Sequence, residues 1–205
     1  LNPHSFYVSR MDKSFFNEIS KSNNVFIDGI GIYVFVVLKN IFSSKNIKRI
    51  TGFDFFQFFL NNSYNKKIFF LGSSKKNLNK IKQNILLENP TCKVFTYSPS
   101  FKEEFTNKDL IKFAKKINRA DPDILFLGLG APKQEKIAIR ISEKTKVKNI
   151  APIGAVFDYY ANNPTFILFL MRFFWLEWIY RLFVKPRVWK RIVEYFIVFL
   201  FMIFF

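Results

Sequence analysis

The sequence predicts an α/β protein in which a Rossmann-like, mostly parallel sheet is flanked by helices and followed by a helical C-terminal appendage. From residue 66 onward, short runs rich in β-branched and aromatic residues alternate with segments of helical apolar spacing. Strands separated by helices of this length form parallel βαβ units with right-handed crossovers. The last 41 residues differ, because they hold all three Trp and ten of the Phe.

The first part of the chain is predicted to lead into this repeat. Apolar spacing indicates a helix at residues 9–20, a short strand at 25–27 that ends at Asp28-Gly29, an apolar run at 30–38 and a helix at 54–60. Neither an internal repeat nor a low-complexity linker interrupts residues 1–164. We therefore predict one Rossmann-like domain over 1–164 and a separate appendage over 165–205.

Within the repeat, the strand at 67–71 (KIFFL) runs into Gly72-Ser73-Ser74, a turn with an N-capping serine. Apolar residues at 78, 81, 85 and 86 predict the helix 77–88, which Asn89-Pro90 ends. The same alternation predicts strands at 93–97, 123–128 and 147–153, and helices at 109–117 and 134–142.

The appendage is basic and aromatic. Pro186 suits the first turn of a new helix whose basic and apolar residues separate onto two faces. The uninterrupted apolar run at 195–205 has 11 residues, whereas a membrane-spanning helix needs about 20. We expect the appendage to lie on a membrane surface rather than cross the bilayer; a solvated basic face over an aromatic core is the alternative.

Composition narrows the function classes. The net charge of +17 attracts polyanions, although 29 Phe beside abundant Lys, Asn and Ile also fit the coding bias of an AT-rich genome. A single cysteine, Cys92, and a single histidine, His4, exclude a disulfide framework and argue against a His/Cys metal site or a Cys-His nucleophile pair. Cys92 is predicted to be a buried residue entering a strand. No signal peptide is visible, so we expect a cytoplasmic protein, and because the chain begins at Leu1 we expect its natural N-terminus further upstream.

Two motifs resemble ligand sites. Gly128-Leu129-Gly130-Ala131-Pro132-Lys133 follows a strand and opens a helix, where glycines let a ligand approach the backbone. It lacks the third glycine and the later acidic residue of a dinucleotide fingerprint, and a tight βα turn is the alternative. Asp121-Pro122-Asp123 imitates a cation-binding DxD but precedes its strand, whereas ligand sites in such sheets lie beyond the carboxyl ends. We expect no metal there.

Two carboxylates lie where ligand sites are expected, at the carboxyl ends of predicted strands. Asp28 directly follows the strand at 25–27, and Asp158 follows the last strand. Either one can serve substrate chemistry, or simply cap a helix or close a turn.

Seven segments together resemble the WecG/TagA/CpsF family of bacterial glycosyltransferases in order and approximate spacing. They are residues 1–5 (LNPHS), 25–31 (VFIDGIG), 49–54 (RITGFD), 70–72 (FLG), 128–135 (GLGAPKQE), 152–158 (PIGAVFD) and 176–181 (LEWIYR). PKQE and LEWxYR are the specific signals. The resemblance covers nearly the whole chain.

The resemblance implies an inverting, metal-independent and cofactor-free transferase on the inner face of the cytoplasmic membrane. Such enzymes move an N-acetylmannosamine-type sugar from UDP onto N-acetylglucosamine carried by undecaprenyl diphosphate, for cell-surface polysaccharide synthesis. On this similarity Asp28 is the general base, while Gln134 and Arg49 are active-site residues. The residues implied to bind substrate are Asn2, Gly128, Gly130, Gly154, Asp158, Arg181 and Arg187, the two arginines reaching the lipid diphosphate.

Two features depart from the family. Residues 161–166 read ANNPTF, where the family carries a glycine and a basic Arg-Ala-Pro-like stretch, a change that bears on donor or acceptor specificity. The family's first strand, expected ahead of Leu1, is absent from the sequence. Two rival functions remain: a catalytically degenerate membrane-surface protein of the same fold, and a basic nucleic-acid-binding α/β protein. The second requires its basic residues to form one face, and we expect no nucleic-acid partner.

Overall fold

A computed structural model describes residues 1–40, 47–162, 197, 198 and 200. By its internal contacts the chain divides into two units, each described by itself. The first comprises residues 1–17, 22–51 and 164–205, and the second residues 18–21 and 52–163. The predicted division after residue 164 stays a prediction, and nearly all of the appendage lies outside the described residues.

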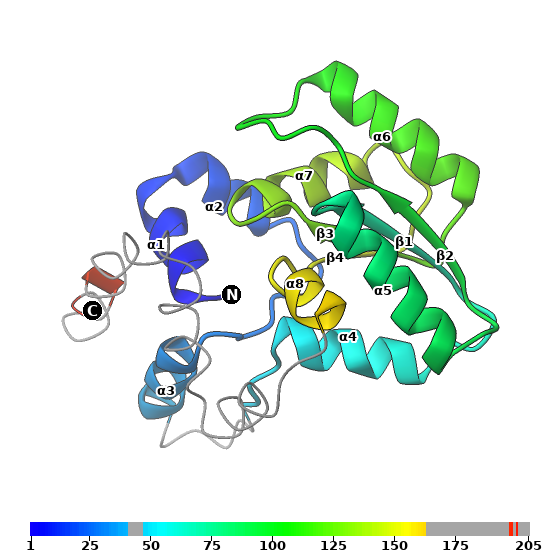
Figure 1. The fold of residues 1–205 in the computed structure, drawn as a ribbon. Coiled ribbons are helices and arrows are strands. Elements are labelled where there is room, and N and C mark those ends of the chain that lie inside the picture. Colours follow the sequence, from blue (N-terminus) through cyan, green and yellow to red (C-terminus); the bar gives the residue numbers. More distant parts are fainter. Residues whose placement is uncertain (41–46, 163–196, 199, 201–205) are drawn as a thin grey trace. The chain divides into compact units, whose positions relative to one another are not determined.

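The second unit is built on a four-stranded parallel sheet of order β2-β1-β3-β4 (Figure 1). Its strands are β1 (Lys67–Gly72), β2 (Lys93–Tyr97), β3 (Ile124–Gly128) and β4 (Asn149–Pro152). The helices that follow them are α5 (Lys75–Glu88), α6 (Asn107–Ala120), α7 (Lys133–Ser142) and α8 (Val156–Ala161), and α4 (Gly52–Asn61) precedes β1. The predicted α/β class and parallel sheet are confirmed.

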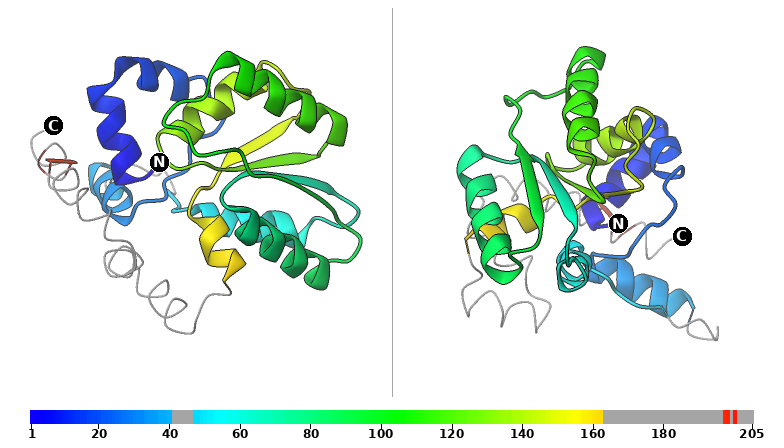
Figure 2. Two further views of the ribbon diagram at one scale, coloured as in Figure 1. Left: turned by 45° about the horizontal axis from the view of Figure 1, so that its top comes forward. Right: turned by 90° about the vertical axis from the view of Figure 1, so that its right-hand side faces the viewer.

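Alternate residues of the central strands build two cores, one on each face of the sheet. Ile68 and Phe70 of β1 pack with α4, α5 and α8, whereas Phe69 and Leu71 pack with α6 and α7. Because both faces are covered, the strands are apolar throughout rather than alternating. Figure 2 shows the helices on both sides of the sheet.

The core beneath α4, α5 and α8 is largely aromatic. The rings of Phe56, Phe70, Phe126 and Phe157 contact one another with centroid distances between 5.2 and 6.1 Å. Such pairs contribute about 0.5–1.5 kcal/mol each beyond the burial of their area. Many of the phenylalanines therefore have a packing role, and Phe157 brings this core up to the carboxyl end of β3.

The amino end of the sheet is closed by charged contacts. Asp123 accepts a hydrogen bond from the Lys67 amide at 2.8 Å, and Asp121 pairs with the Lys67 ammonium at 3.1 Å. The Asp-Pro-Asp motif thus lies at the edge opposite the carboxyl ends of the strands, as predicted. Cys92 is buried beside the start of β2, where its thiol donates to the Ser63 carbonyl at 3.1 Å, which confirms its predicted environment.

The first unit contains α1 (Pro3–Met11) and α3 (Ile30–Lys39), and α2 (Lys13–Ile19) crosses from the first unit into the second. The predicted single helix at 9–20 is wrong. α1 ends at Met11, and the Asp12 carboxylate accepts a hydrogen bond from the Phe15 amide at 3.0 Å, where the second helix, α2, begins. The predicted strand at 25–27 is also wrong: within the described part of the chain, isolated backbone bonds join this region to its neighbours, including one from the Ile50 amide to the Ile27 carbonyl at 3.0 Å.

Among the described residues, none of the helices combines the length and the apolar character that crossing a bilayer requires.

Candidate functional site

A pocket of about 390 Å³ opens at the carboxyl edge of the sheet in the second unit. Three loops form it, which follow β1, β2 and β3. Their lining residues are Ser73, Ser74, Ser98, Pro99, Ser100, Phe101, Lys102, Phe105, Gly128, Leu129 and Lys133. The chain leaves β1 toward α5 on one face and β3 toward α7 on the other, and ligands bind at such a switch point in open α/β sheets.

The ends of β1 and β3 approach closely at the floor of this pocket. Gly72 has a φ of +116°, and a Cβ there would lie 2.4 Å from the Gly128 carbonyl oxygen. The Ser73 amide donates to that same oxygen at 2.9 Å, and the Ser98 hydroxyl donates to the Ser73 carbonyl at 2.7 Å. These bonds hold the first two loops against the third, so the hydroxyl groups are placed by backbone contacts.

The two predicted glycines at the end of β3 and in the loop after it, Gly128 and Gly130, have different surroundings. A Cβ on Gly128 would lie 2.5 Å from the Phe157 ring, so this glycine is needed for packing as well as lining the pocket. Gly130 has a φ of +83° with open space beside it, and its carbonyl accepts from the Gln134 amide where α7 starts. The predicted tight βα turn is therefore present, and the space beside its backbone is open at Gly130.

Gln134 and Gly154 lie together beyond the ends of β3 and β4. Gln134 is 5% exposed, its Nε2 donates to Glu135 at 3.1 Å, and its buried Oε1 has no hydrogen-bond partner among the described residues. A Cβ on Gly154, whose φ is +48°, would lie 3.0 Å from that oxygen. A buried acceptor without a partner costs free energy, so this amide is suited to receive a substrate donor.

Asp158 is connected to the pocket wall through one residue. The Asn77 side chain donates to the Asp158 carboxylate at 3.0 Å and lies 3.4 Å from the Ser73 hydroxyl. The alternative that Asp158 caps a helix is wrong, because it lies within α8, whose N-cap is Ala155.

In the first unit, three separate segments meet around Asp28. Its amide donates to the Leu1 carbonyl at 3.0 Å, and its carbonyl accepts from Arg49 Nε at 2.6 Å. Asn2 caps α1 by accepting from the Ser5 amide at 2.9 Å. The capping alternative for Asp28 does not hold either, because Gly29 is the N-cap of α3.

The Asp28 carboxylate has no hydrogen-bond or ion-pair partner within the described part of the chain. Arg49 therefore fixes the backbone of Asp28 and not its carboxylate. The structure brings Asp28, Arg49 and Asn2 together in one unit and Gln134, Gly154, Gly128, Gly130 and Asp158 in the other. Arg181 and Arg187 lie outside the described residues.

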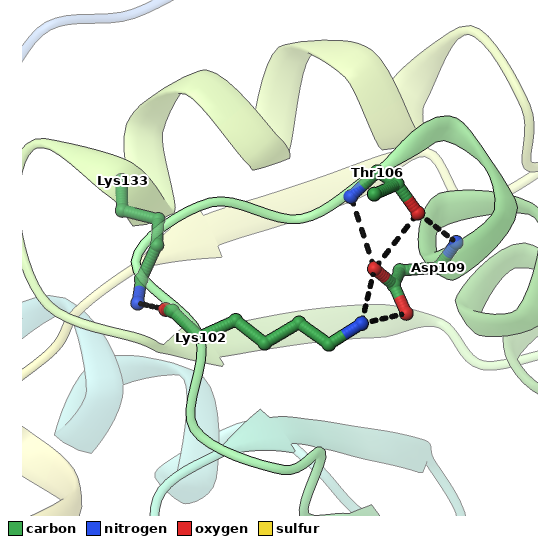
Figure 3. A network of polar contacts seen from close by, with 4 residues as sticks. All are labelled: Lys102, Thr106, Asp109 and Lys133. Carbon is green, nitrogen blue, oxygen red and sulfur yellow. Dashed lines mark hydrogen bonds and ion pairs between the residues drawn. The ribbon is translucent and has the colours of Figure 1, made fainter.

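The loop after β2 is the part of the pocket that the sequence analysis missed. Lys133 Nζ donates to the Lys102 carbonyl at 2.6 Å, and the Lys102 ammonium pairs with Asp109 at 2.8 Å (Figure 3). Asp109 also forms a capping box with Thr106 at the start of α6. The sequence did contain an indication of this loop's role, because the segment directly follows a predicted strand and so lies at the carboxyl edge of the sheet.

Two ionisable groups of this network have lowered pKa values. The bonds from Lys102 and then from Thr106 lower the pKa of the Asp109 carboxyl to about 2. Burial lowers the pKa of the Lys133 ammonium, which also lies 5.0 Å from the Phe101 ring centroid and 5.3 Å from that of Phe105.

Among the described residues, no group of His, Cys, Asp or Glu has the arrangement of a metal site.

Comparisons with known proteins agree over nearly the entire sequence. The model of the glycosyl transferase WecG/TagA/CpsF family matches residues 1–205. The chain is 31% identical to the N-acetylglucosaminyldiphosphoundecaprenol N-acetyl-beta-D-mannosaminyltransferase of Bacillus subtilis (strain 168), over 95% of this chain and 73% of that protein. The protein of the same description from Bacillus spizizenii (strain ATCC 23059 / NRRL B-14472 / W23) is 26% identical over 94% of this chain and 73% of its own. A UDP-Gal:alpha-D-GlcNAc-diphosphoundecaprenol beta-1,4-galactosyltransferase of Shigella boydii is 26% identical over 93% and 78%, respectively.

Proposed function

The chain belongs to the WecG/TagA/CpsF family of glycosyl transferases and is a hexosyltransferase, and on that premise we propose that it transfers an N-acetylmannosamine-type sugar from UDP to N-acetylglucosamine on undecaprenyl diphosphate. The names of the three relatives share this acceptor but differ in the sugar, which is N-acetylmannosamine in the two Bacillus proteins and galactose in the Shigella protein. We take the acceptor from all three and the donor sugar from the Bacillus relatives.

The observation that carries the proposal is the pocket at the carboxyl edge of the sheet. Four serines and two lysines line it: Ser73, Ser74, Ser98, Ser100, Lys102 and Lys133. Hydroxyl groups can bond to sugar and phosphate oxygens, and ammonium groups offset the charge of a diphosphate. We assign this pocket to the nucleotide-sugar donor.

In the proposed reaction Asp28 is the general base. A hydroxyl of the acceptor N-acetylglucosamine attacks the anomeric carbon of the donor from the face opposite UDP, and the Asp28 carboxylate takes the hydroxyl proton. The new C–O bond forms as the bond to the UDP oxygen breaks, and UDP leaves with that electron pair. The configuration at the anomeric carbon is therefore inverted. Arg49 supports the base by holding the Asp28 carbonyl.

The Gln134 amide is proposed to bind substrate rather than to move a proton. Its buried Oε1 can accept a hydrogen bond from a hydroxyl or N-acetyl N–H group. Gly154 leaves room for the amide, and Gly130 presents an open backbone. Asn2, Gly128 and Asp158 complete the proposed substrate contacts, and Asp158 can act through Asn77 on the Ser73 hydroxyl.

The appendage is proposed to bring the enzyme to its lipid acceptor. Arg181 and Arg187 would bind the acceptor diphosphate, because guanidinium groups form paired bonds to phosphate oxygens. The surrounding basic and aromatic residues would bind the anionic inner face of the cytoplasmic membrane, with about 1 kcal/mol per basic residue near the surface. On this proposal neither a metal nor another cofactor is required.

Release of UDP tests the function directly. The full chain is incubated with UDP-N-acetylmannosamine, with and without a synthetic lipid-diphosphate-linked N-acetylglucosamine, and UDP-galactose is run in parallel. We expect release that depends on the acceptor and is faster with the N-acetylmannosamine donor. Faster release from UDP-galactose would correct the donor, and no release from a folded, membrane-bound protein would favour the degenerate alternative.

A further inference from the structure

Phe101 is an apolar side chain with an unusual position. It is 86% exposed, on the loop between β2 and α6. Single exposed apolar side chains are ordinary on protein surfaces, and Phe58 of α4, 68% exposed, is one. Phe101 differs from Phe58 because its ring lines the pocket at the carboxyl edge of the sheet.

The loop that carries Phe101 is fixed at several points. Lys133 Nζ lies over the Phe101 ring, 5.0 Å from its centroid, and donates to the carbonyl of the next residue, Lys102. The Lys102 ammonium in turn pairs with Asp109 in the first turn of α6 (Figure 3). The backbone on the C-terminal side of Phe101 is thus held by α7 and α6 together. A ring presented in this way loses little further freedom when a ligand binds to it.

The pocket combines two kinds of surface. Its serine hydroxyls and lysine ammonium groups suit sugar and phosphate oxygens, whereas the exposed ring of Phe101 suits a flat, uncharged heterocycle. A nucleoside diphosphate sugar carries both kinds of group on one molecule. Lys133 occupies one face of the ring, and the high exposure of Phe101 leaves the remainder open to a base.

We propose that Phe101 is a stacking platform for the nucleobase of the donor, and hence a residue that makes the enzyme prefer a nucleotide-linked sugar to a simple sugar phosphate. This inference rests on the proposed assignment of the pocket to the donor. It adds that the base binds on the loop after β2, while the diphosphate binds among the hydroxyl and ammonium groups of the other lining residues.

Calorimetric titration of the full chain tests the stacking role. The ligands are UDP and inorganic diphosphate, and the proteins are the wild type, Phe101→Ala, Phe101→Tyr and the matched control Phe58→Ala. We expect Phe101→Ala to weaken UDP binding about tenfold, in the range seen when a base loses an aromatic partner, and to leave diphosphate binding unchanged. Phe101→Tyr, which keeps the ring, and Phe58→Ala should bind UDP like the wild type.

The outcomes separate this inference from the proposed function. If Phe101→Ala binds UDP as tightly as the wild type, the stacking role is overturned and the donor pocket stands. If the variant loses affinity for UDP and diphosphate equally, the ring acts on the phosphate site through Lys133 and stacking is again overturned. If the folded wild type binds no UDP, the assignment of the pocket to a UDP-sugar donor fails, and the stacking role fails with it.

Discussion

Replacing Gly154 by alanine tests whether the turn after β4 sets the position of the Gln134 amide. Gly154 has a φ of +48°, a backbone conformation that costs an L-residue about 1–2 kcal/mol. The added Cβ would lie 3.0 Å from Gln134 Oε1 and 3.1 Å from Nε2, so the amide has to move by a few tenths of an ångström. Because a misplacement of about 1 Å can reduce a rate about 100-fold, we expect turnover to fall about tenfold.

Two further variants separate backbone strain from displacement of the amide. Gly130→Ala also places alanine at a positive φ, +83°, but its Cβ would have open space. In urea unfolding, the free energy of unfolding of both variants should be about 1–2 kcal/mol lower than that of the wild type. An equal loss identifies the shared cost of a positive φ at alanine.

For turnover, the double variant Gly154→Ala/Gln134→Ala should be no slower than Gln134→Ala alone, because the methyl group acts only through the amide. Additive losses in that cycle, or full activity of Gly154→Ala, would refute the reasoning.

Other outcomes are expected for Asp28, for metal chelation, for the appendage and for Asp109. Asp28→Asn should reduce turnover about 100-fold or more while UDP still binds, because the general base is lost; near-normal turnover would remove Asp28 from that role. EDTA should leave the rate nearly unchanged, and activity that chelation abolishes and Mg²⁺ restores would contradict a metal-independent reaction. Arg181→Ala/Arg187→Ala should weaken use of the lipid acceptor far more than UDP binding, and deleting 165–205 should release the protein from anionic liposomes. Unchanged transfer by the folded double variant would leave the appendage as an anchor only, and retention of the truncated protein would place the membrane contact elsewhere. In an NMR titration, the Asp109 carboxyl should protonate near pH 2, below its ordinary 3.8, so the ion pair with Lys102 holds above pH 4 and is lost as the pH falls toward 2. Protonation near pH 4 would show that the pair does not form in solution.

The repeat of strands and helices was predictable because its signals are local. The strand at 93–97 is found with the predicted bounds, and α7 differs from its prediction by one residue. In these segments the apolar residues that form each element also form its contact with the core, so periodicity and packing agree. Gly128 ends β3 and Gly130 follows it, and this placement follows from the same alternation.

The parts of the fold and of the site that could not be predicted depend on contacts between segments that are distant in the sequence. Residues 25–27 have the composition of a strand, but among the residues that the structure describes this region has backbone bonds to scattered partners such as Leu1 and Ile50 and is not part of a strand ladder. The short helix α8 was not predicted, and it changes Asp158 from a capping candidate to a partner of Asn77, 81 residues away. The contact between Gln134 and Gly154 likewise joins two loops whose proximity only the sheet order determines.

The sheet also bears on how the positive charge should be interpreted. Exposed lysines of α5, such as Lys75, Lys76 and Lys82, lie on one face of the second unit, and those of α6, such as Lys112 and Lys115, lie on the other. A nucleic-acid-binding surface would gather such residues on one face, so the distribution in this unit argues against that rival function. A lysine acquires a specific role only where the fold surrounds it with partners. Lys102 and Lys133 meet that condition beside the pocket, where the Lys102 ammonium pairs with Asp109 and the Lys133 ammonium donates to the Lys102 carbonyl.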